Sequence, residues 1–156
     1  MKNLFIIALL LFAIAGCNQG DKKVSTTQET INHNSSDSIK DGIFIHITES
    51  YKDPHRILMP LKMAELMSKD KDVLIYMDIH AVDVLVKAAK DIEFADFESA
   101  HTYIKRLIQN KVTIMACPTC LKIAGLKPED LMEGVQVAQK DKFFSFTKGR
   151  IITLDY

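Results

Sequence analysis

The fold is indicated most clearly by residues 112–120, Val-Thr-Ile-Met-Ala-Cys-Pro-Thr-Cys. The first five are β-branched or apolar, which is typical of a buried strand. Two cysteines follow at once. Leu121 to Ala124 is helical in character, and Gly125 fits the end of a short helix. A strand that passes directly into a helix is the connection on which α/β folds are built.

The same alternation of strand and helix continues on both sides of this stretch. Strands are predicted at residues 42–48, 72–78, 112–116, 135–138 and 150–155, and helices from Asp53-Pro54, around 82–89, from Asp96, and around 143–146. Pro60 is expected to kink the first helix or to delay its start. Because these strands are apolar throughout, the sequence predicts an α/β three-layer sandwich. Its sheet should be mainly parallel, with about five strands and helices on both faces.

Composition limits the possible functions. The chain has 156 residues, enough for one domain, and its 20 basic residues equal its 20 acidic residues. This neutrality argues against a nucleic-acid-binding protein, which would carry an excess of Lys and Arg. Three cysteines are too few for a disulfide scaffold. Neither a dinucleotide fingerprint nor a Walker sequence is present, and no cofactor is expected.

The first seventeen residues have the features of an export signal. Lys2 precedes an apolar run from Leu4 to Ala15, which as a helix would rise only ~18 Å and is too short to span a bilayer comfortably. The run ends in Ile-Ala-Gly-Cys17, which resembles the lipobox of bacterial lipoproteins. That resemblance implies cleavage after residue 16 and lipid attachment to the Cys17 thiol. An ordinary signal peptide with an incidental cysteine is the alternative.

Three segments therefore follow one another along the chain. Residues 1–16 are predicted to be the signal peptide, and residues 17–41 the lipidated cysteine with a flexible tether rich in Ser, Thr, Asn and Gln. Residues 42–156 form the domain. We expect the protein in the cell envelope, anchored by lipid to a bacterial membrane and facing the periplasm.

Candidate site residues follow the predicted strands. Because ligands bind outside the carboxyl ends of parallel strands, the residues just after each strand should meet at one edge of the sheet. These residues are Glu49 after the first strand, His80 after the second, and Cys117 and Cys120 after the third. The remaining histidines of the domain, at 46, 55 and 101, are interpreted as structural or exposed.

The two cysteines leave three chemistries open. Cys117 falls where free backbone N–H groups and a helix dipole would stabilise a thiolate, and Cys120 lies one turn further on. The pair could transfer sulfur or cycle as a disulfide. It could also bind a soft metal such as Cu or Zn together with His80 or Met115. We expect the Cys117 thiol to have the lower pKa of the two.

From Gly42 to Tyr156 the chain resembles the DsrE/TusD-like (DsrE/DsrF-like) sulfur-relay family. The resemblance is carried by residues 42–48, 112–121 and 149–155, and by the eight-residue spacing from Cys117 to Gly125. It implies a small α/β fold in homotrimers or homohexamers, with a persulfide carried on Cys117 near a subunit boundary. Many relatives have no cysteine at the position of Cys120.

Together these inferences predict a membrane-tethered protein that carries sulfane sulfur on Cys117. Cys120 would release it as sulfide, and His80 or Glu49 would manage the proton. Its partners would be sulfur donor and acceptor proteins or small persulfides, but not nucleic acid. Whether the protein is an enzyme, such as a sulfurtransferase, or only a carrier stays open. The disulfide oxidoreductase and metal-binding alternatives also stay open.

Overall fold

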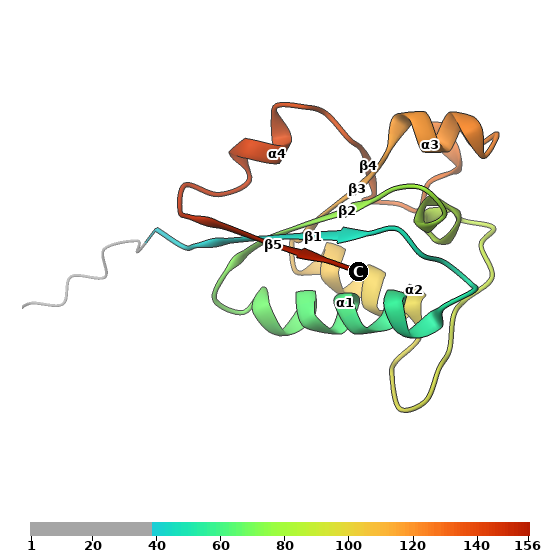
Figure 1. Ribbon diagram of the computed structural model, residues 1–156, viewed down its shortest axis with the longest axis horizontal. Helices are drawn as coiled ribbons and strands as arrows, with labels where there is room; N and C mark the ends of the chain where they lie inside the picture. Colours follow the sequence, from blue (N-terminus) through green and yellow to red (C-terminus); the bar gives the residue numbers. More distant parts are fainter. Residues whose placement is uncertain (1–38) are drawn as a thin grey trace, which may run out of the picture. The chain divides into compact units, whose positions relative to one another are not determined.

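The computed structural model describes residues 39–156. They form a five-stranded sheet in the order β4-β3-β2-β1-β5, with every neighbouring pair parallel (Figure 1). The predicted α/β class with its parallel sheet is confirmed. The strands are β1 Gly42–Ile47, β2 Asp72–Met77, β3 Thr113–Ala116, β4 Gln136–Val137 and β5 Ile151–Asp155. The helices are α1 Pro54–Met67, α2 Ala100–Gln109, α3 Pro118–Ile123 and α4 Lys142–Ser145, with 3₁₀ helices η1 Ala81–Leu85 and η2 Pro128–Asp130.

One face of the sheet carries the main core. Alternate residues of the strands point to this face, where α1 and α2 cover them (Figure 1). Its fully buried side chains include Ile45, Ile75 and Ile114 from the strands and Leu61 and Leu107 from the helices. Each such side chain contributes about 1.5–3 kcal/mol through removal from water, so this layer accounts for most of the stabilising burial.

The opposite face is covered less completely. Within residues 39–156, the helices over this face are the short α3 and α4 (Figure 1), and Phe44, His46 and Tyr76 on this face remain half-buried. The prediction of helices on both faces is met, but these helices have six and four residues. Space is therefore left between the sheet and α4.

The first helix begins at the predicted position, Asp53-Pro54. Asp53 caps it, accepting a hydrogen bond from the Arg56 backbone N–H at 3.3 Å, and the helix begins at Pro54 with Pro60 inside it. Of the two effects expected of Pro60, a kink or a delayed start, the delayed start does not occur. Proline fits the first helical turn because it has no N–H to satisfy there, and the buried Pro60 ring is accommodated further along by packing.

The segment after β2 is less helical than predicted. The segment predicted as a helix around 82–89 forms the 3₁₀ helix η1, whose β-branched valines favour extended backbone beyond it, and Val86 forms a β-bridge with Leu131. Just before β1, Asp41 forms a separate contact with Arg150, which precedes β5. It accepts three hydrogen bonds from Arg150, two of them from the guanidinium group. This pairing joins the start of β1 to the start of β5.

Among residues 39–156, no helix has the length and apolarity needed to span a bilayer. The predicted signal peptide, Cys17 and nearly all of the predicted tether lie outside the described residues.

Candidate functional site

Cys117 lies at the junction between β3 and α3. Its backbone N–H donates to the Met77 carbonyl at 3.0 Å, which continues the ladder between β2 and β3. Cys117 is the N-cap of α3, and Pro118 takes the first helical position, where a missing N–H costs nothing. The sulfur accepts a hydrogen bond from the Cys120 backbone N–H at 3.4 Å. The predicted end of this helix is also found, since Gly125 has a φ of 70°.

The surroundings of Cys117 favour its thiolate. Burial by itself raises the pKa of the thiol, but hydrogen bonds from the Tyr76 hydroxyl, the Cys120 thiol and the N–H groups of Cys120 and Thr119 outweigh it. The net result is a pKa below the usual value for cysteine. Tyr76 shows the reciprocal effect: burial, and then the interaction with Cys117, raise the pKa of its phenol. The hydroxyl therefore stays protonated and available as a donor.

Tyr76 was not predicted as a site residue, because it lies within an apolar run. Its ring stacks on His46 at 5.5 Å between centroids and meets the edge of Phe143 at 5.0 Å. His46 is held in turn, with its ring nitrogens 3.0 Å from Asp78 Oδ1 and 2.9 Å from Asp155 Oδ1. These contacts fix the ring whose hydroxyl reaches Cys117. One signal was present in the sequence: His46, Tyr76 and Asp78 place polar atoms on one face of strands that are otherwise apolar.

Cys120 has a different environment. Burial, and then the neighbouring Cys117, raise the pKa of its thiol. The two thiols thus differ in the direction expected from the sequence, although the hydrogen bond from Tyr76 was not foreseen. The sulfur of Cys120 accepts a hydrogen bond from the Ile79 backbone N–H at 3.1 Å. Ile79 has a φ of 49°, a strained conformation for a β-branched residue, and such strain is concentrated at functional sites.

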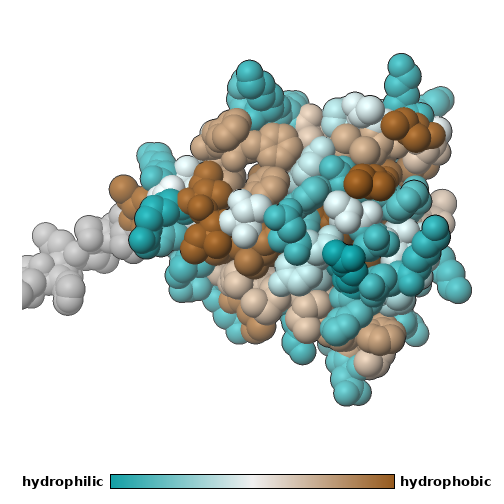
Figure 2. Space-filling view, in the orientation of Figure 1, coloured by the Kyte–Doolittle hydropathy of each residue, from teal (hydrophilic) through white to brown (hydrophobic). Residues whose placement is uncertain are grey.

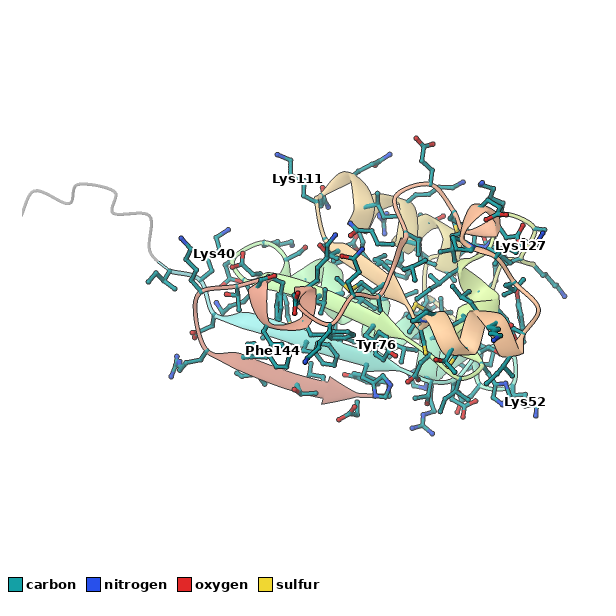
Figure 3. The ribbon with its side chains drawn as sticks, turned by 90° about the horizontal axis from the view of Figure 1, so that it is seen from above. Lys40, Lys52, Tyr76, Lys111, Lys127 and Phe144 are labelled. Atoms are coloured by element: carbon teal, nitrogen blue, oxygen red, sulfur yellow. The ribbon has the colours of Figure 1, made fainter. Side chains whose placement is uncertain are left out.

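The two sulfurs open into different cavities. Cys117 lines a cavity of about 580 Å³, here called the aromatic cavity, together with Phe44, Tyr76, Phe143 and other residues. Figure 3 shows Tyr76 and Phe144 over the same face of the sheet. Cys120 lines a second cavity of about 460 Å³, here called the His80 cavity, with Ile79, His80, Asp83, Ile123 and Ala124. Both cysteines are free thiols.

Of the other two predicted site residues, His80 lines one of the two cavities and Glu49 lines neither. His80 lies beside Cys120 in the His80 cavity and does not line the cavity of Cys117. Glu49 lines neither cavity, because the chain after β1 turns toward α1 on the opposite face of the sheet. His55 packs against Phe94 and Phe97, at ring distances of 5.7 and 5.5 Å, as part of a separate aromatic cluster.

The metal-binding alternative can be compared with this geometry. Within the described part of the chain, no three His, Cys, Asp or Glu side chains are placed so that they could hold a metal ion. Cys117, Cys120 and His80 therefore do not form a three-ligand group as they lie. The arrangement suits chemistry on sulfur. Cys117 has a stabilised thiolate that accepts a hydrogen bond from the Cys120 backbone N–H, Cys120 supplies a second free thiol, and each thiol lines a cavity.

Several solved structures are similar to the chain, including the following two. A protein of unknown function from Methanobacterium thermoautotrophicum superposes with a TM-score of 0.54 at 21% sequence identity, over 74% of this chain and 100% of the other. The ychN protein from E. coli superposes with a TM-score of 0.56 at 18% identity, over 73% and 99% of the two chains. At these identities the likeness establishes the fold alone.

No match was found among curated proteins. The model of the DsrE/DsrF-like family matches residues 41–149, well over half of the chain and including both cysteines of the site. The match spans β1 to α4, so it includes the strand that carries Tyr76 as well as the junction that carries Cys117. The chain therefore belongs to the DsrE/DsrF-like family.

Proposed function

We propose that the protein carries sulfane sulfur as a persulfide on Cys117. The observation that carries this proposal is the hydrogen bonding of the Cys117 sulfur, which lowers the pKa of the thiol at the wall of a cavity. A thiolate is the nucleophile in sulfur chemistry. In the loading step, the Cys117 thiolate attacks the terminal sulfur of a donor R–S–SH. A Cys117–S–SH persulfide forms and R–S⁻ leaves with the electron pair of the broken S–S bond.

Cys120 provides a route for discharge. Its thiolate attacks the inner sulfur of the Cys117 persulfide, which gives a Cys117–Cys120 disulfide and releases HS⁻. The Ile79 N–H stabilises negative charge on the Cys120 sulfur. We propose that His80, which lines the same cavity, takes up the thiol proton. A reducing partner must then return the disulfide to two thiols. Direct transfer of the persulfide sulfur to an acceptor thiol does not need this step.

Membership of the DsrE/DsrF-like family is consistent with sulfur relay in general. We further propose that Cys17 is lipidated, that the domain is held at the periplasmic side of a bacterial membrane, and that it exchanges sulfur with donor and acceptor proteins or small persulfides there. We propose homotrimers or homohexamers as its assembly. β5 is an edge strand of the sheet, and its Ile151 and Ile152 are 43% and 54% exposed, which leaves apolar surface for such contacts.

A thiol–disulfide oxidoreductase is the second candidate. The observation in its favour is that the two free thiols lie one helical turn apart and that each shifts the pKa of the other. In this function sulfur is never carried, and both cysteines are needed for every turnover.

The mass of the intact protein after exposure to polysulfide separates the two candidates. Sulfur transfer predicts the gain of one sulfur atom in Cys120→Ser, where discharge by Cys120 is blocked, and no gain in Cys117→Ser. In the wild type, discharge converts the loaded form to the disulfide, so the Cys120→Ser variant decides between the two candidates. The oxidoreductase predicts loss of two hydrogens in the wild type and no sulfur gain in either variant. Normal sulfur loading of Cys117→Ser would overturn the assignment of Cys117 as the carrier.

A further inference from the structure

The aromatic cavity has a wall that can recognise an organic molecule. Phe44 and Tyr76 line it from the sheet, Phe143 and Phe144 line it from α4, and Ile151 lines it from β5. Three of these rings pack on one another, since Phe143 lies 5.7 Å from Phe44 and 5.0 Å from Tyr76. Figure 2 shows apolar atoms gathered over α4 and the start of β5. An inorganic polysulfide or hydrosulfide needs no wall of this kind.

The charge of the cavity lining favours a negatively charged ligand. Lys140 lies in its lining, and the described residues that line it include no acidic side chain. Hydroxyl groups are supplied by Tyr76, Thr119 and Thr153. The cavity of about 580 Å³ falls within the range that holds small organic ligands, which are bound by apolar walls with a few polar groups. The lining is therefore complementary to a molecule with an apolar body and one negative group.

We propose that the aromatic cavity binds an organic persulfide with an aromatic or compact apolar body and a single anionic group, such as a carboxylate. The body lies against Phe143 and Phe144, the anion faces Lys140, and the S–SH group meets Cys117. This inference rests on the proposed function and names its donor class. Transfer follows the loading step above, with R–S⁻ as the organic thiolate that leaves the cavity.

The test uses a ligand that cannot exchange sulfur. para-(Methylthio)benzoate has the aromatic body and the carboxylate, but its sulfur is a thioether. Its neutral partner is para-(methylthio)benzamide. Calorimetric titration of the full-length protein should show one saturable site per chain for the benzoate. Light scattering at the same concentration monitors the assembly state.

Lys140→Met should weaken binding of the benzoate about threefold to fivefold and leave binding of the benzamide unchanged, as expected for a partly solvated ion pair. Lys122→Met, which alters a lysine of α3 outside the cavity lining, is the matched control and should change neither affinity. Phe143→Leu should weaken binding of both ligands, because it removes an aromatic ring and keeps an apolar side chain.

Absence of saturable binding, or equal benzoate affinity in the wild type and Lys140→Met, would overturn the inference. Loss of binding upon assembly would overturn it as well, since a second copy of the chain would then occupy the cavity. These outcomes are separate from the proposed function. If polysulfide still loads Cys117 while the benzoate does not bind, the carrier function stands and the donor class is wrong. If the benzoate binds but no persulfide forms on Cys117, the cavity binds an organic anion and the carrier function is wrong.

Discussion

The variant Tyr76→Phe isolates the hydrogen bond that distinguishes Cys117. It removes the hydroxyl that stabilises the thiolate and keeps the ring that packs against His46 and Phe143, at 5.5 and 5.0 Å. The sulfur's hydrogen bond from the Cys120 N–H is untouched. We therefore expect the pKa of Cys117 to rise while the fold is retained.

The size of the change follows from the chemistry of the bond. A hydrogen bond to a charged group contributes about 1.5–3 kcal/mol. Cys117 is only half-buried, so solvent replaces part of the lost interaction and the lower end of that range applies. Since one pKa unit corresponds to about 1.4 kcal/mol, the pKa should rise by roughly one unit. Below both pKa values, the thiolate fraction at a given pH should then fall about tenfold.

The measurement is the rate of alkylation by iodoacetamide as a function of pH. The variants are made in a Cys120→Ser background, so that Cys117 is the one thiol of the domain that iodoacetamide can alkylate. Mass spectrometry identifies the alkylated residue. Tyr51→Phe is the control, because that hydroxyl donates to the Lys90 carbonyl at 3.0 Å and does not line the cavity of Cys117. An unchanged or lower pKa in Tyr76→Phe, with the control at the wild-type value, would refute the role of Tyr76.

Three further outcomes are expected. Ile79 has a φ of 49°, a conformation that Asn tolerates and Val does not. In urea unfolding, Ile79→Asn should therefore be more stable than Ile79→Val by about 1 kcal/mol, and the reverse order would contradict backbone strain at this residue. The Arg150 guanidinium holds the pKa of Asp41 below its usual value, so the folded state gains stability above about pH 4 and loses it on acidification. Asp41→Asn should accordingly lower the melting temperature at pH 7 but not near pH 2, and equal losses at both would exclude this linkage. Cys17→Ser should abolish lipid labelling and release the protein from membranes, and undiminished membrane binding would contradict lipidation.

The fold was predictable from the sequence because its strands are short and apolar and lie between clear helix signals. The strand around Ile75 and the strand before Cys117 both had to be buried on two faces, and a parallel sheet is the arrangement that allows this. The effect of Pro60 inside α1 was less predictable, since a proline there would disfavour a helix that lacked tertiary packing. Burial of Pro60 in the core offsets that preference.

The site was predictable only in part. Residues one helical turn apart share a face of a helix, which suggested that Cys117 and Cys120 address one ligand. The structure separates them because Cys117 is the N-cap with extended backbone, at ψ 120°, and Cys120 lies within the helical turn. Their side chains therefore leave the chain in different directions, and each reaches its own cavity. Spacing alone does not contain this information.

The end of β2 controls both sulfurs without contributing either. Tyr76, inside the strand, donates to Cys117, and Ile79, just beyond it, donates through its backbone to Cys120. The register that pairs Tyr76 with Met115 brings this segment beside the start of α3. A side-chain donor can be removed by one substitution, whereas a backbone donor persists in any non-proline variant. The reactivity of Cys117 should therefore be the more sensitive to substitution, and changes in β2 should alter which thiol reacts first while both cysteines stay in place.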